Sequence, residues 1–136
     1  MNATISEIMT VQPVTVSVDT PLPDVYRIAK EHSIHHLPVV DGGRLVGIIS
    51  RTDLERVSFV NDPNSANVVE AMWDFLRTEN LMTRSVVTIR KDQTVREAAE
   101  LLKDGKIHAL PVVEGGEIAG IVTTTDLIRY LLENCD

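Results

Sequence analysis

The chain has 136 residues, of which 43% are hydrophobic and 24% are charged, and its formal net charge is −7 at pH 7. This length allows one ordinary domain, or two half-sized units that share an interface. The negative charge argues against a general affinity for nucleic acid, which needs several lysines or arginines on one face, whereas a small anionic ligand needs only a few local donors.

The sequence predicts a cytoplasmic protein that makes no membrane contact. No apolar run reaches the roughly 18 residues of a membrane-spanning helix, and the first residues have neither the basic nor the apolar region of a signal peptide. Cys135 is the single cysteine and has no partner in the chain, which is typical of a free thiol in a reducing compartment.

Taken in chain order, the first half predicts the element order β-α-β-β-α. Residues 14–16 are β-branched and predict a short strand, and Asp19, Thr20 and Pro21 offer a helix cap followed by a proline. Apolar residues then recur at helical spacing and predict the buried face of a helix: Leu22, Val25, Tyr26, Ile28 and Ala29.

A hairpin and a second helix follow. Residues 37–40 and 45–49 predict two strands, and Gly42 and Gly43 between them supply the positive backbone angles of a tight turn. Asp53 then opens a helix. Further on, residues 61–65 predict a loop, after which an inserted helix shows an apolar face that is typical of a core or oligomer contact: Val69, Met72, Trp73 and Leu76.

The second half repeats the first. Ile5–Leu54 aligns without a gap on Thr78–Leu127, with 19 of 50 positions identical. The second copy predicts strands over residues 87–89, 110–113 and 118–122, a helix over residues 95–102 that stops at Gly105, and a last helix that Asp126 opens. The apolar residues predicted on the buried face of the helix at 95–102 are Val95, Ala98, Ala99, Leu101 and Leu102.

One three-stranded sheet is too small to be stable alone. We therefore expect an α/β (α+β) fold of two β-α-β-β-α repeats, packed sheet to sheet with pseudo-two-fold symmetry. Residues 1–63 would form the first repeat, 64–77 a linking helix and 78–136 the second repeat.

Both copies carry the pattern Gly-x-x-Ser/Thr-x-Thr-Asp where a strand meets a helix, at Gly47–Asp53 and Gly120–Asp126. The glycine lets a ligand approach the backbone, and hydroxyls and amides at a helix start can donate to a phosphate. The aspartate can accept hydrogen bonds from a ribose diol. The alternative is that these residues only cap helices, but two copies in register favour nucleotide binding.

Three histidines, His35, His36 and His108, lie just before or at the start of the Leu-Pro strands. They are either polar residues at a strand entrance or donors to a phosphate, and Lys106 is either a solvated lysine or a further cation for the same pocket. A metal site from His32, His35 and His36 is disfavoured, because no carboxylate or thiolate at ligand spacing joins them. No nucleophile–base pair, paired carboxylates or Walker-type loop appears, so we do not expect an enzyme.

The tandem series of His-x-Leu-Pro-Val-Val, acidic-Gly-Gly and Gly-x-x-Ser/Thr-x-Thr-Asp resembles a pair of CBS domains (named for cystathionine β-synthase), together a Bateman module. The openings Ile8–Thr10 and Leu81–Thr83 are similar to the family as well. The resemblance implies adenosine ligands, namely AMP, ADP or ATP and less often S-adenosylmethionine, in clefts between the two repeats.

The resemblance also implies roles for single residues. Asp53 and Asp126 would hold ribose hydroxyls, and Thr15 and Thr88, with the backbone near Val14 and Val87, would border the base. Hydroxyl contacts to ribose or phosphate are implied for Ser50, Thr52, Thr123 and Thr125. The other candidate binding residues are Leu37, Pro38, Gly47, Arg51, Leu110, Pro111 and Gly120.

On the phosphate side, His35, His36, His108 and Lys106 resemble phosphate-contacting positions of the regulatory subunit of AMP-activated kinase. Ala109, also a candidate binding residue, departs from that relative, which has a basic residue there, and Ser33 aligns with Lys106. We therefore expect the two sites to differ in affinity, or only one of them to fill.

These features predict a stand-alone regulatory module that binds adenosine nucleotides and transmits their level to a separate partner protein. By analogy with the family we also expect a homodimer that holds four CBS units. The alternative function is a structural dimerisation module whose clefts are vestigial or bind S-adenosylmethionine.

Overall fold

The computed structural model describes residues 3–57 and 75–135. The predicted loop at 61–65 and most of the inserted helix lie outside the described residues, although Leu76 is described and half-buried. The chain divides into two compact units. Unit 1 consists of residues 1–13, 43–45 and 86–136, and unit 2 of residues 14–42 and 46–85.

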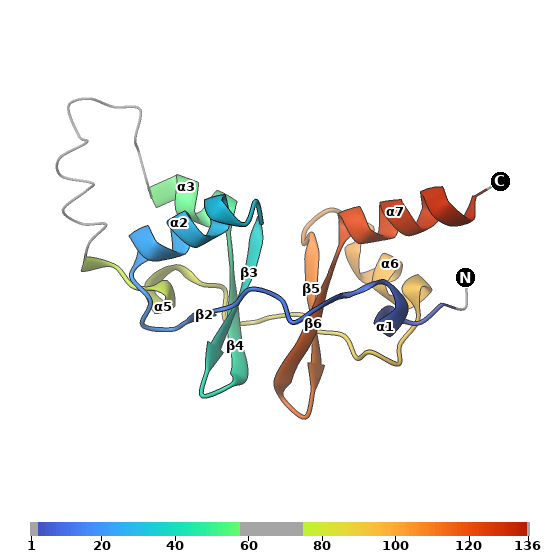
Figure 1. Ribbon diagram of the computed structural model, residues 1–136, viewed down its shortest axis with the longest axis horizontal. Helices are drawn as coiled ribbons and strands as arrows, with labels where there is room; N and C mark the ends of the chain where they lie inside the picture. The colour runs from blue at the N-terminus through green and yellow to red at the C-terminus, as the bar shows by residue number, and fades with distance from the viewer. Residues whose placement is uncertain (1–2, 58–74, 136) are drawn as a thin grey trace. The chain divides into compact units, whose positions relative to one another are not determined.

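Unit 2 is built on a small sheet in which β3 lies between β2 and β4. Its elements are β2 (Val16–Ser17), α2 (Leu22–Glu31), β3 (His36–Asp41), β4 (Arg44–Ser50, whose first two residues group with unit 1), α3 (Arg51–Val57) and α5 (Thr78–Leu81). β2 runs parallel to β3, with Val16 opposite Val39. Helix α3 contacts α2, and Figure 1 shows the two helices near the end of β4 from which α3 starts.

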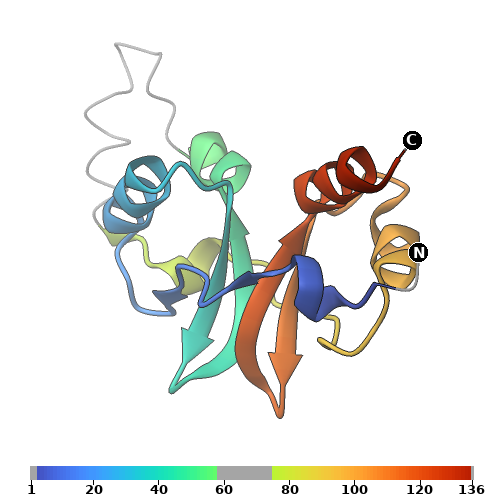
Figure 2. The same cartoon turned by 45° about the vertical axis from the view of Figure 1, so that its right-hand side comes forward.

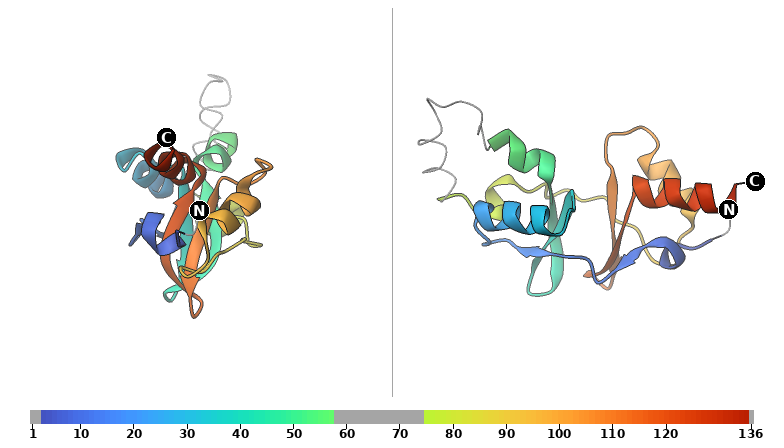
Figure 3. Two further views of the ribbon diagram at one scale, coloured as in Figure 1. Left: turned by 90° about the vertical axis from the view of Figure 1, so that its right-hand side faces the viewer. Right: turned by 45° about the horizontal axis from the view of Figure 1, so that its top comes forward.

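Unit 1 has the corresponding elements: α1 (Ile5–Ile8), β1 (Thr10–Val11), α6 (Val95–Leu102), β5 (Ala109–Glu114), β6 (Glu117–Thr123) and α7 (Thr124–Asn134). β6 pairs antiparallel with both β5 and β1. Figure 2 shows the blue N-terminal segment beside the orange strands of this unit. Helix α1 also contacts α7, and both views of Figure 3 show α1 close to it.

Each unit has its own hydrophobic core, and the two cores use equivalent residues. The core of unit 2 contains Val16, Leu22, Val25, Ala29, Leu37, Val39, Ile49, Leu54 and Met82. The core of unit 1 contains Ile5, Ile89, Val95, Ala98, Leu102, Leu110, Val112, Val122 and Leu127. Eight of these pairs are related by the 73-residue shift of the sequence repeat, so the repeat is a repeat of packing as well as of sequence.

The predicted α+β fold is confirmed, with three local differences. The strand predicted at 87–89 is reduced to one parallel bridge between Ile89 and Val112. The N-cap of helix α2 is Pro21, whose side chain has no polar atom, and the expected cap residue Thr20 instead accepts a hydrogen bond at Oγ1 from the amide of Ser17 at 3.1 Å. Leu101, predicted on the buried face of α6, is 40% exposed. The packing of one sheet on the other stays a prediction.

The opening residues of each repeat fold into the unit that the other repeat builds. In unit 1 the amide of Ile5 donates to the carbonyl of Gln93 at 2.8 Å. In unit 2 the equivalent amide of Thr78 donates to the carbonyl of Thr20 at 3.0 Å. Ile5 and Thr78 are both fully buried. The two openings are therefore exchanged between the repeats.

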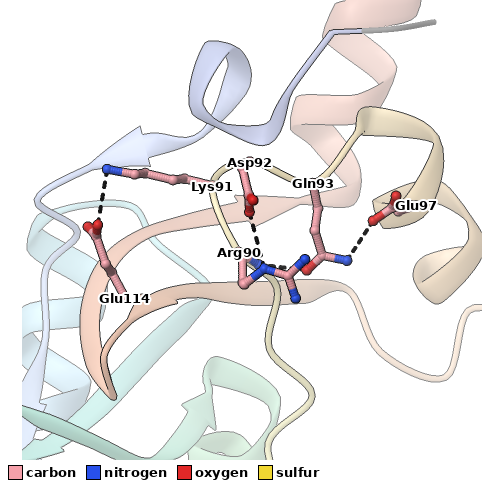
Figure 4. Close-up of polar contacts among 6 residues, drawn as sticks. All are labelled: Arg90, Lys91, Asp92, Gln93, Glu97 and Glu114. Carbon is pink, nitrogen blue, oxygen red and sulfur yellow. Dashed lines mark hydrogen bonds and ion pairs between the residues drawn. The ribbon is translucent and has the colours of Figure 1, made fainter.

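The loop that receives the N-terminal residues is held by its own polar contacts (Figure 4). Gln93 Oε1 accepts from the amide of Arg90 at 2.8 Å, and Gln93 Nε2 donates to Glu97 Oε2 at 2.6 Å. Lys91 Nζ lies 3.3 Å from Glu114 Oε1 on β5. These contacts fix the loop whose carbonyl groups accept hydrogen bonds from Ile5 and Ser6.

Candidate functional site

The strand-to-helix junction of unit 2 is a reciprocal cap between Ser50 and Asp53. The amide of Ser50 donates to Asp53 Oδ2 at 3.0 Å, and the amide of Asp53 donates to Ser50 Oγ at 3.1 Å. This is the arrangement of a capping box, which satisfies amides at the start of a helix. The two side chains predicted to meet a ribose or phosphate are thus fixed next to each other at the start of α3.

Unit 1 has the same cap between Thr123 and Asp126. Asp126 Oδ2 accepts from the amide of Thr123 at 2.9 Å, and the amide of Asp126 donates to Thr123 Oγ1 at 3.3 Å. Asp126 Oδ1 also lies 3.2 Å from Arg129 Nη1. Because an ionised carboxylate has about four acceptor positions, the capping role leaves room for a ligand hydroxyl.

One main-chain hydrogen bond joins each cap to the histidine before the Leu-Pro strand. The amide of Arg51 donates to the carbonyl of His35 at 2.8 Å, and the amide of Thr124 donates to the carbonyl of His108 at 3.0 Å. The two sequence motifs of each copy therefore lie side by side, and we call this junction of the cap and the histidine the corner of the unit. Thr52 and Thr125, which lie between the hydroxyl and the aspartate, are exposed at this corner.

The Leu-Pro residues of both motifs are buried, so their side chains support the site from within. Leu37 and Leu110 belong to the two cores, and Pro38 and Pro111 are buried beside them in the strands. The residues predicted to border the base come just before β2 in unit 2 and just before Ile89 in unit 1. β2 pairs in parallel with Val39 and Val40, and Ile89 forms a parallel bridge with Val112, so both pair with the residues that follow Leu-Pro. Val14 and Thr15 are half-buried, whereas Val87 and Thr88 are exposed.

The glycines of the motif have a packing role that the sequence interpretation missed. A Cβ atom on Gly47 would lie 2.6 Å from Met82 Sδ and 2.9 Å from the carbonyl of Thr83. On Gly120 it would lie 2.8 Å from both Met9 Sδ and the carbonyl of Thr10. Both glycines thus make room for the exchanged Met-Thr opening, and their contact with a ligand stays a prediction. The Met-Thr pair that recurs in both copies, at residues 9–10 and 82–83, is the sequence feature that could have indicated this packing role.

The cationic side chains differ between the two corners. Unit 2 has His35, which is exposed, and His36 and Arg51, which are half-buried. Unit 1 has His108 and Lys106, both exposed, and Ala109 is buried at the position equivalent to His36. Unit 1 therefore has no basic side chain at the position of His36, so the two corners present different cationic groups to an anion.

Among residues 3–57 and 75–135, no group of three or more His, Cys, Asp or Glu side chains is arranged to hold a metal ion. None of the helices in those ranges has the length and apolar character that crossing a bilayer requires.

The CBS domain family model matches residues 5–59 and 78–133, and the chain belongs to this family. An uncharacterized protein of Methanocaldococcus jannaschii, MJ1225, is 34% identical over 134 residues, which cover 95% of this chain. The chain spans 47% of that relative. The chain is also 34% identical to an inosine-5′-monophosphate dehydrogenase of Korarchaeum cryptofilum. That match covers 84% of this chain but only 21% of the dehydrogenase.

Two solved structures are similar over nearly their whole length. CBSX2 in complex with AMP has a TM-score of 0.81 and 29% identity, and the match covers 96% of this chain and 97% of that one. The CBS domain pair of protein MJ0100, in complex with 5′-methylthioadenosine and S-adenosyl-L-methionine, has a TM-score of 0.81 and 28% identity. That match covers 98% of both chains.

Proposed function

We propose that this CBS pair binds adenosine nucleotides (AMP, ADP or ATP) at the two capped corners and transmits their level to a partner protein. The observation that carries the proposal is the repeated corner, at which an aspartate and a hydroxyl are fixed by reciprocal capping next to a histidine. A cap with only a structural role would not require a histidine next to it in both units.

The chemistry of each group suits a different part of a nucleotide. A capped carboxylate has acceptor capacity left for a ribose diol. Hydroxyls such as the exposed Thr52 and Thr125, together with imidazole, can donate to phosphate oxygens. The two similar structures that hold AMP, or methylthioadenosine and S-adenosylmethionine, support the adenosine part. The histidines and Arg51 favour a phosphorylated ligand over the sulfonium of S-adenosylmethionine.

Calorimetric titration with AMP, ADP, ATP, S-adenosylmethionine and 5′-methylthioadenosine tests the proposal. GMP is the matched control, because it keeps ribose and phosphate and changes only the base. We expect AMP, ADP or ATP to bind and GMP to bind at least about tenfold more weakly, which corresponds to the loss of roughly one hydrogen bond to the base. No binding of any adenosine compound would contradict the proposal and leave a structural module.

A second proposed property is a homodimer, which one specific observation favours. Helix α7 carries three exposed apolar side chains: Ile128 at 52%, Leu131 at 53% and Leu132 at 76% exposure. Exposed apolar groups that gather on one helix are typical of an interface. The homodimer would hold four CBS units, and a regulated partner protein would read their ligand state.

A further inference from the structure

The guanidinium of Arg51 has a buried nitrogen that forms no hydrogen bond within the described residues. Arg51 Nε is shut off from solvent and has no hydrogen-bond partner there. Its carboxylate neighbour, Glu55 Oε1, lies 3.5 Å away, whereas charge-assisted hydrogen bonds are typically about 2.7–2.9 Å long. Most buried donors in folded proteins are satisfied, so this one has capacity left for a group that the chain itself does not supply.

The position of Arg51 links this donor to the candidate site. Arg51 is the first residue of α3, between Ser50 and the rest of the cap. Its own amide bonds to the carbonyl of His35, which is the histidine proposed to meet a phosphate. Only 28% of the Arg51 side chain is exposed, so a charge here is less screened by water than one on an open surface.

The equivalent residue of unit 1 cannot play this part. The 73-residue shift relates Arg51 to Thr124, whose hydroxyl donates to the carbonyl of His108 at 3.4 Å. Lys106 is a possible cation for this corner, but it is exposed, and exposed ion pairs contribute little to affinity. The two corners therefore share the ribose-binding groups and differ in the cation.

We propose that Arg51 makes the site of unit 2 selective for phosphorylated ligands, by binding the phosphate of an adenosine nucleotide. Without a ligand, the guanidinium forms a long ion pair of 3.5 Å with Glu55. A bound phosphate replaces Glu55 as the nearest anionic group to Arg51. A planar guanidinium can bind two phosphate oxygens at once, which a hydroxyl cannot do. The site of unit 1 has no equivalent guanidinium, so its affinity for a ligand should depend less on whether that ligand carries a phosphate. This inference rests on the proposed function.

Calorimetry with AMP and with adenosine, on the wild type and on Arg51→Thr, tests the inference. The variant installs the residue of the equivalent position. We expect the tighter AMP site to weaken about tenfold, with adenosine affinity unchanged within about twofold. Arg96→Thr on α6 is the control, because it removes the same charge elsewhere and should leave both ligands unaffected. Thermal melting checks that each variant is folded.

Two further variants sharpen the test. Arg51→Lys keeps the charge but loses the planar fork, and should give an intermediate AMP affinity. Glu55→Gln removes the competing carboxylate, and should raise AMP affinity by about threefold, because the 3.5 Å ion pair that it breaks is long and has an exposed carboxylate. It should not change adenosine affinity.

The outcomes separate this inference from the proposed function. If neither ligand binds the wild type, both are wrong. If adenosine binds but AMP affinity is the same in Arg51→Thr, or if both ligands weaken equally, only the role of Arg51 is wrong. A fall in AMP affinity in Glu55→Gln would also contradict the competition with Glu55.

Discussion

The backbone of Gly47 lies so close to Met82 that a Cβ atom on the glycine would be 2.6 Å from the methionine sulfur. Met82 belongs to the second repeat in sequence and to the core of unit 2 in space. Gly120 and Met9 repeat this contact in unit 1. The pair thus marks the point at which each repeat depends on residues of the other.

Replacing these glycines with alanine should destabilise the protein. At Gly47 the added methyl group meets a side chain and also the carbonyl of Thr83 at 2.9 Å, which cannot move without shifting the exchanged opening. Overpacking of this kind typically costs about 1–3 kcal/mol. Urea unfolding of Gly47→Ala and Gly120→Ala measures the loss. In the double variant Gly47→Ala, Met82→Ala, the cost of the added methyl group should become smaller. Equal stability of Gly47→Ala and the wild type would show that the contact is not tight.

The end of helix α2 offers a stabilising substitution. Ser33 has a φ of 53°, a conformation that costs residues other than glycine about 1 kcal/mol. Because glycine also gains entropy in the unfolded chain, Ser33→Gly should gain only about 0.5 kcal/mol. Gly105→Ala is the matched opposite: its φ is 75° and no atom lies near an added Cβ, so backbone strain alone should lower stability. Changes of the same sign in the two variants would contradict this interpretation.

The histidines should contribute to binding of the phosphate, because imidazole can donate a hydrogen bond to a phosphate oxygen. We expect His35→Ala to weaken AMP binding about fivefold, and to leave the affinity for adenosine, which has no phosphate, nearly unchanged. Calorimetry with both ligands on the wild type and on this variant measures the difference. Unchanged AMP affinity, or an equal change for adenosine, would make the histidines ordinary polar residues at the strand entrance.

The proposed homodimer should depend on the apolar face of α7. Leu131→Ser with Leu132→Ser removes two exposed side chains whose loss should not unfold unit 1. We expect light scattering at micromolar concentration to give a dimer for the wild type and a monomer for this variant. Glu133→Gln on the same helix is the control and should stay dimeric. A monomeric wild type would overturn the proposal.

The repeat made most of the local structure predictable. Both hairpins and the helices α2, α3, α6 and α7 follow from periodicity, glycine pairs and capping residues. Helices α3 and α7 begin at Arg51 and Thr124, however, two residues before the aspartates that were expected to open them. The exchange of openings could not be read in this way, because an alignment of Ile8–Thr10 with Leu81–Thr83 says nothing about which repeat each segment packs against. For the same reason the sequence pattern indicates a ligand, and not Met82, as the close neighbour of Gly47.

At the candidate site, the sequence offered two interpretations of the aspartates, as helix caps or as ribose ligands. The structure confirms the cap, with Asp53 Oδ2 on the amide of Ser50, and the ribose contact stays a proposal. The two roles are compatible because one carboxylate can accept several hydrogen bonds. The unused donor of Arg51 depends on atomic burial, which no sequence pattern reports.

The most direct test of the account is AMP binding to Asp53→Asn, Asp126→Asn and the double variant, measured by calorimetry beside thermal melting. Asparagine keeps an acceptor for the cap but loses one of the acceptors that a ribose diol needs. We expect the melting temperatures to change little, and each site to bind AMP about tenfold more weakly. If the double variant binds AMP as tightly as the wild type, the capped aspartates do not hold a nucleotide, and the central claim is wrong.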